Sequence, residues 1–287
     1  MFARVTVVRS IVWRGVSLIQ RMGVMTWPMK PDRNTTLWWT SLRVVSVLNI
    51  LAFVGVVATM DWSLAWRGWH LLLAGVYAGV CAFRSFFPRV DLERTVMVDH
   101  WLSSIVLGRT AATIAEMCFT AQLALVLLEA STVVPWLYPI GVAILPLIAV
   151  AQVACWMGAL TGNHLWHAVE ELLWTAMVLL MGVAGAGLWM HFGFGVRVFV
   201  GVGWLGCLSA VVVMSGLDVP MYIRRWRTET QAGTKFLSVG EGFVDALHRR
   251  EPTGSWEVWR HEVAWMTPYF SASVWLSLFL ARFSVAM

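Results

Sequence analysis

Seven long apolar stretches run through this chain and constrain its fold more than any other feature. Each is long enough to cross about 30 Å of hydrocarbon at a rise of about 1.5 Å per residue. An α-helix satisfies its own backbone hydrogen bonds, as a segment in lipid must. The sequence therefore predicts an all-α, polytopic membrane protein with a bundle of seven transmembrane helices. We place the spans at residues 42–60, 69–87, 107–128, 139–160, 172–190, 196–217 and 263–281.

The composition excludes the common soluble classes. Of the 287 residues, 59% are hydrophobic and only 13% are charged, whereas a soluble domain carries about a quarter charged residues. Too few charged side chains remain to cover a surface that faces water. The four cysteines stand singly in apolar stretches, so we expect reduced packing residues. The lipid bilayer is the expected partner. Nucleic acid is not, because basic loops on one side of a membrane explain the net charge of +5.

Basic residues predict the orientation. With the N-terminus inside and alternating spans, nearly all Lys and Arg residues fall in inner segments, and Arg67, Arg197 and Arg282 fall outside. We therefore expect an integral membrane protein with its N-terminus inside and its C-terminus outside. A bacterial inner membrane and a mitochondrial inner membrane fit equally well. The segment 161–171 departs from the pattern, because it lacks Lys and Arg and carries two glutamates.

Two helices are expected beside the spans. Residues 1–24 have no acidic group and place their polar side chains on one stripe, which is typical of an amphipathic helix in the membrane plane. The same composition also suits a mitochondrial transit peptide. A second interfacial helix is expected near residues 235–249. We divide the chain into an N-terminal interfacial segment, 1–34, and a single transmembrane bundle, 35–287, with an inner-side loop at 223–262.

The third span carries a polar stripe. Arg109, Thr113, Glu116 and Thr120 follow at i, i+4, i+7 and i+11, so they share one helix face. An ionisable residue at the bilayer centre costs roughly 2.5–3.5 kcal/mol, so the stripe must face the bundle interior or a wet cavity. It is either an interhelical hydrogen-bond network or a functional site. Because Arg109 and Glu116 are two turns apart, we expect each to find its partner on another helix.

The fifth span opens with a possible metal half-site. Asn163 is a good N-cap, and His164, His167 and Glu171 share one face of the helix that follows. Two imidazoles and a carboxylate suit a divalent metal or a proton relay, although capping at the membrane interface also explains them. Asp218 is expected at the C-terminal end of the sixth span, where its charge needs compensation by nearby arginines or by a bound cation.

These groups predict a polar cavity on the inner side. The leading hypothesis is a membrane-embedded enzyme that acts on a lipid or another lipophilic substrate with a metal or proton-transfer centre. Glu116 would serve as general acid or base, Arg109 would hold an anionic head group, and Asp218 would assist. Two alternatives stay open: a proton-coupled transporter or channel, and a structural subunit that docks membrane protein partners in a larger complex.

Overall fold

The computed structural model describes residues 31–61, 66–191 and 193–282. Seven helical segments within this part are long and apolar enough to cross a membrane. A helical protein with seven such segments is therefore confirmed, whereas their insertion into a bilayer and its orientation stay predictions. The helices are α2 (Arg33–Ala58), α3 (Arg67–Phe86), α4 (Ile105–Ala130), α5 (Tyr138–Thr161) after a 3₁₀ turn at Pro135–Leu137, α6 (His164–His191), α7 (Phe194–Val213) with α8 (Val219–Gln231), and α11 (Val263–Phe270) with α12 (Ala272–Arg282).

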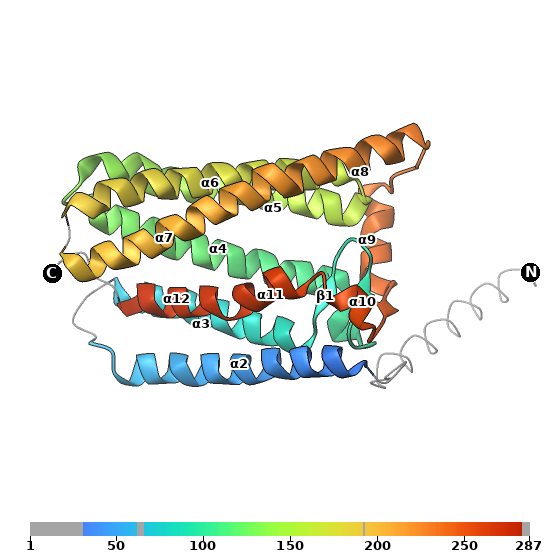
Figure 1. Ribbon diagram of the computed structural model, residues 1–287, viewed down its shortest axis with the longest axis horizontal. Coiled ribbons are helices and arrows are strands. Elements are labelled where there is room, and N and C mark those ends of the chain that lie inside the picture. The colour runs from blue at the N-terminus through green and yellow to red at the C-terminus, as the bar shows by residue number, and fades with distance from the viewer. Residues whose placement is uncertain (1–30, 62–65, 192, 283–287) are drawn as a thin grey trace, which may run out of the picture.

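The long helices lie side by side with their axes roughly along one direction (Figure 1). Two apolar clusters hold them together, one among α2, α3, α11 and α12 and the other among α4, α5 and α6. Helix α7 packs on α6 and leaves large apolar side chains such as Leu205 and Leu208 about two-thirds exposed. An apolar face of this kind suits lipid surroundings, because acyl chains are as apolar as leucine.

A small sheet and a crossing helix close one end of the bundle, which we call the sheet end. Strands β1 (Arg89–Val90) and β2 (Thr95–Val96) are antiparallel, and β3 (Glu251–Pro252) runs parallel to β2. Helix α9 (Val239–His248) lies across this end, beside the short helix α10 (Trp256–Trp259) (Figure 1).

Helix α9 begins with a capping box and packs through a glycine. The Ser238 hydroxyl accepts from the Glu241 backbone N–H, and the Glu241 carboxylate accepts in return. This hydrogen bonding lowers the pKa of Glu241. A Cβ on Gly242 would lie 2.0 Å from the Leu160 carbonyl oxygen, so glycine allows this close approach to α5. The interfacial position predicted for this segment stays a prediction, and the predicted amphipathic helix at 1–24 lies outside the described residues.

A buried arginine fastens the sheet end to α4. The Arg89 guanidinium donates to the carbonyl oxygens of Phe87, Leu102 and Ser104 at 3.2, 3.1 and 2.8 Å. Burial lowers the pKa of Arg89 to about 9. The guanidinium also lies against Gly108, where an added Cβ would be 2.3 Å from Arg89 Cδ. This arginine therefore ties the loop before α4 to the first turn of that helix.

The sixth span does not end at Asp218, and the prediction of a helix terminus there is wrong. A π-helical turn, Met214–Asp218, joins α7 directly to α8, so one helix continues to Gln231. Pro220 lacks a backbone N–H, and the wider turn before it lets the helix pass the proline. Isolated π turns of this kind occur frequently at functional sites.

The seventh span is broken in its middle. Helix α11 contains Pro268 and ends at Phe270, and α12 begins after Ser271. Asn49 of α2 compensates the break, because its side-chain amide donates to the Phe270 carbonyl at 2.8 Å and accepts from the Trp275 indole at 2.8 Å. A broken helix is tolerated at membrane depth where neighbouring helices satisfy its backbone in this way.

Candidate functional site

The polar stripe of α4 faces the interior of the bundle, as predicted. Thr120 is fully buried, and the side chains of Arg109 and Glu116 are 9% and 12% exposed. The two side chains nevertheless pair directly, with 3.0 Å between Arg109 Nη2 and Glu116 Oε1. The expectation that the two would not pair directly is wrong, because the long arginine side chain extends along the helix axis and bridges two turns. The expected partners on another helix are also present, since both side chains bond to Gln152 of α5.

Helix α5 completes this set of contacts, which we call the Arg109 network. Gln152 accepts from Arg109 Nη2 at 3.2 Å and from the Thr113 hydroxyl at 3.0 Å, and it donates to Glu116 Oε2 at 2.6 Å. Tyr269, which precedes the break in the seventh span, donates to Glu116 Oε1 at 3.2 Å. Both carboxylate oxygens of Glu116 are therefore engaged, and three helical segments meet at this side chain.

A second buried group lies on α5 and α6 and is formed by Cys155, His167 and Glu170. We call it the Cys155 cluster. Each residue offers one metal-ligating atom, and these atoms lie within 4.8 Å of one another. His167 Nδ1 lies 2.9 Å from Glu170 Oε2. The three side chains are buried, so the cluster is screened from water.

The imidazole of His167 has an unused nitrogen. Its Nε2 is buried and has no hydrogen-bond partner among the described residues. This nitrogen faces Gly158, where an added Cβ would lie 2.5 Å from it. Buried polar atoms in proteins are normally hydrogen-bonded, but this nitrogen packs against the backbone of Gly158 instead. Gly158 provides the space that the ring needs.

The structure brings together only part of the metal half-site predicted from the sequence. Asn163 accepts from the Leu165 backbone N–H, in line with its predicted capping role. His167 belongs to the Cys155 cluster, whereas His164 Nδ1 lies 2.8 Å from Glu229 Oε2 on α8. Glu171 is not part of that cluster. The predicted ligand set of His164, His167 and Glu171 therefore does not appear as one group.

Carboxylates are concentrated around the Cys155 cluster. Glu170, Asp218 and Glu116 act electrostatically on Glu171. Among the described residues, Arg109 is the guanidinium that acts on Glu170 and Glu116. Burying an ionised carboxylate without a partner is costly. The carboxylates outnumber the guanidinium groups here, so protons, the His167 imidazole or a bound cation would balance their charge.

Sequence reasoning missed four members of the site: Cys155, Glu170, Gln152 and Tyr269. Gln152 is the one strongly polar residue within the predicted span 139–160, and Cys155 follows it by three residues on the same helix face. Glu170 stands three residues after His167, which also places it on the same face. A lone glutamine in an apolar span was the available signal for α5.

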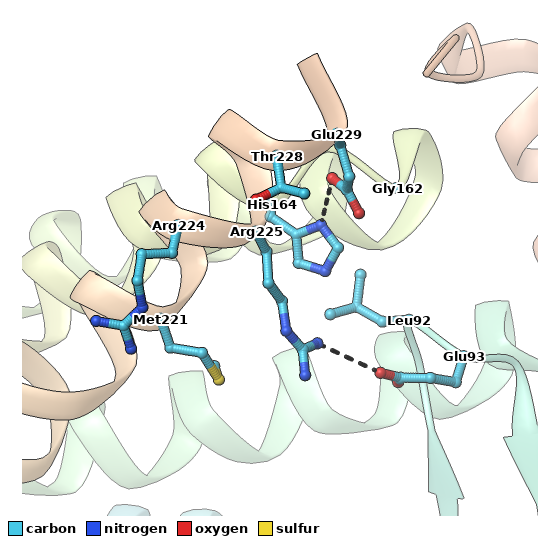
Figure 2. Close-up of a pocket in the computed structure, with 9 residues that line it drawn as sticks. All are labelled: Leu92, Glu93, Gly162, His164, Met221, Arg224, Arg225, Thr228 and Glu229. Carbon is cyan, nitrogen blue, oxygen red and sulfur yellow. Dashed lines mark hydrogen bonds and ion pairs between the residues drawn. The ribbon is translucent and has the colours of Figure 1, made fainter. Parts of the chain in front are cut away.

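A cavity of about 630 Å³ opens beside this centre, at the sheet end. Its walls come from the start of α6, from α8 and from the turn between β1 and β2 (Figure 2). Tyr222 lies near both the cavity and the Cys155 cluster: its ring centroid is 6.1 Å from that of His164, which lines the cavity, and 5.3 Å from that of His167. This aromatic ring therefore contacts one residue of each.

No family model, no curated protein and no solved structure matches this chain.

Proposed function

We propose that this protein is a membrane-embedded enzyme that binds a divalent metal at the Cys155 cluster and acts on a lipophilic substrate that enters from the sheet end. One observation carries the proposal: a thiol, an imidazole and a carboxylate lie buried within 4.8 Å of one another. The surrounding carboxylates favour a cation at this place. The cavity at the sheet end lies near it, and we propose that the substrate approaches from there.

The chemistry of the donors favours zinc. Zn²⁺ accepts cysteine sulfur, histidine nitrogen and glutamate oxygen, and catalytic zinc sites typically use three protein ligands with one position left for water or substrate. When bound, such an ion supplies Lewis-acid activation and a hydroxide near neutral pH. The protein's own contribution is to exclude bulk water from the site and to hold the His167 ring through Glu170 and Gly158.

The structure changes the roles that we assign to Arg109, Glu116 and Asp218. Arg109 and both oxygens of Glu116 are bonded within the Arg109 network, so we assign them a positioning role that joins α4 to α5. Asp218 lies in the π turn and acts on Glu171. Asp218 and Glu171 have no ion pair to a basic residue within the described part of the chain, and they are our candidates for proton transfer.

Metal analysis tests this proposal. The full chain, purified in detergent after supplementation with zinc, should carry about one zinc ion per chain. The double variant Cys155→Ser/His167→Ala should lose it, and His164→Ala is the matched control that should retain it. Each variant should elute as a single species in size-exclusion chromatography, so that loss of metal is not loss of fold. Metal-free wild-type protein, or a double variant that keeps its zinc, would overturn the proposal.

A second function, proton-coupled transport, is favoured by the broken seventh span. Discontinuous helices form the substrate sites of many transporters, and here Tyr269 beside the break donates to Glu116. This function predicts pH-driven uptake of a solute into proteoliposomes that Glu116→Gln abolishes and Cys155→Ser/His167→Ala leaves intact. The enzyme proposal predicts the reverse, with a metal-dependent reaction that fails in the double variant.

A further inference from the structure

The cavity at the sheet end contains a guanidinium without a partner. Arg224 and Arg225 of α8 both line it (Figure 2). Arg224 is exposed and forms no ion pair within the described part of the chain. Arg225 lies 3.7 Å from Glu93, and both side chains of this pair are about half exposed. Such an exposed pair contributes little energy and opens readily for a better anion.

The acidic groups of the cavity already have partners. Glu229 lies 2.8 Å from His164 Nδ1, and Glu93 faces Arg225. The pairing of Glu229 with His164 also joins α8 to α6 and so fixes the distance between two walls. Arg224 is the cation left over, and the adjacent Arg225 can turn toward the same ligand. Two neighbouring guanidinium groups suit a phosphate, because each can donate two parallel hydrogen bonds to its oxygens.

The same helix continues from the cavity as an apolar surface. Met221 lines the cavity three residues before Arg224, and Leu217 stands four residues before Met221 on the same face, with 61% of its surface exposed. A ligand with its charged group at the arginines would therefore place an attached hydrocarbon chain along α7. This arrangement of cation and apolar surface fits an amphipathic molecule better than a free ion.

We infer that the cavity binds the phosphate head group of an anionic membrane lipid through Arg224 and Arg225, with an acyl chain along Leu217. This inference rests on the proposed function in one respect: it names the substrate class that would approach the Cys155 cluster past Tyr222. Lipid binding itself needs only the cavity. A free phosphate shares the head-group chemistry, so the test separates the two sources.

The test measures binding of phosphatidic acid to the full chain in detergent by native mass spectrometry. Arg224→Gln/Arg225→Gln should weaken binding about tenfold or more, since two charge-assisted contacts are lost. The matched control is Arg227→Gln, an exposed arginine of the same helix that does not line the cavity, and it should change binding less than about threefold. Phosphatidylcholine should bind at least about tenfold more weakly than phosphatidic acid, because it is zwitterionic.

Three outcomes would overturn the inference. The first is an equal loss in Arg227→Gln, which would indicate general attraction to basic residues. The second is binding of inorganic phosphate as tight as that of the lipid, which would assign the site to a soluble anion. The third is equal binding of phosphatidylcholine. Zinc content distinguishes this inference from the proposed function: the arginine variants should retain zinc, and Cys155→Ser/His167→Ala should retain lipid binding.

Discussion

Two regions of the bundle bury polar side chains, and they differ in charge. Toward the end opposite the sheet, Gln122 of α4 donates to the carbonyl oxygens of His70 and Ser277 at 3.0 and 3.2 Å and accepts from the Ser277 hydroxyl. Asn49 bonds across the break in the seventh span in a similar way. We call these contacts the amide region. Its amide groups are neutral and hydrogen-bonded, as a structural network requires.

The charged region contains the Arg109 network and the Cys155 cluster. It is built from ionisable groups, and it holds more carboxylates than guanidinium groups. Both regions join helices that lie far apart in the sequence. The amide region shows that neutral amides are sufficient to join helices in this protein. We infer that the cost of burying charge in the other region serves a purpose beyond helix association.

The largest effect should come from separating the buried ion pair. Glu116→Leu should lower the free energy of unfolding by about 3–5 kcal/mol, because Arg109 would keep a buried charge without its carboxylate. Equilibrium unfolding in mixed micelles measures this change. The double variant Arg109→Leu/Glu116→Leu should recover part of the loss, since neither charge of the pair remains, while Glu170 loses the guanidinium that acts on it. A double variant as unstable as Glu116→Leu would show that the pair does not act as a unit.

The next effect concerns the space around His167. Gly158→Ala should weaken zinc binding about 10- to 100-fold, because the new methyl group would displace the His167 imidazole ring from its present position. Competition with a chelator measures the affinity. Gly182→Ala is the matched control, because a Cβ at Gly182 meets nothing within 4 Å. Equal affinities in wild type and Gly158→Ala would separate His167 from the metal and weaken the distinction between the two regions.

Most of the fold could be predicted from the sequence, because bilayer thickness and backbone hydrogen bonding limit an apolar chain to few solutions. The inward direction of the α4 stripe followed from the cost of exposing Glu116 to lipid. The π turn and the break at Ser271 could not be predicted, because they depend on how Pro220 and Asn49 are accommodated by tertiary contacts.

The candidate site was only partly predictable. Helical spacing placed His164 and His167 on one face, but α8 lies beside α6 and supplies Glu229, which pairs with His164. The pairing between α5 and α6 that brings Cys155 to His167 is a long-range contact and leaves no periodic signal in either helix. The pairing of Arg109 with Glu116 depended on the rotamer of a flexible side chain, which helix geometry alone does not determine.

A smaller effect is expected in the amide region. Gln122→Leu should lower the free energy of unfolding by about 0.5–1.5 kcal/mol, because the hydrogen bonds to His70 and Ser277 are neutral. Zinc content should stay at the wild-type level. Unfolding in mixed micelles and metal analysis measure the two quantities, and Gln231→Leu, an exposed glutamine, serves as the control for the substitution itself. Loss of zinc in Gln122→Leu would contradict the separation of the regions.

The smallest effect should be a dependence of stability on pH, which neutral amides cannot provide. Glu262 precedes the seventh span, and burial raises its pKa, although the Trp265 indole that donates to it acts in the opposite direction. A carboxyl group with a raised pKa in the folded state stabilises the fold most below its ordinary pKa of about 4.3, and this contribution is lost as the pH rises through the folded-state value.

In Glu262→Gln the amide oxygen can still accept from Trp265 but does not titrate. The melting temperature of the wild type should therefore fall relative to that of Glu262→Gln by about 2 °C between pH 4 and pH 8. Equal pH dependence of the two melting temperatures would show that Glu262 makes no net contribution, and any pH dependence of stability would then have to come from other carboxylates, such as those around the Cys155 cluster.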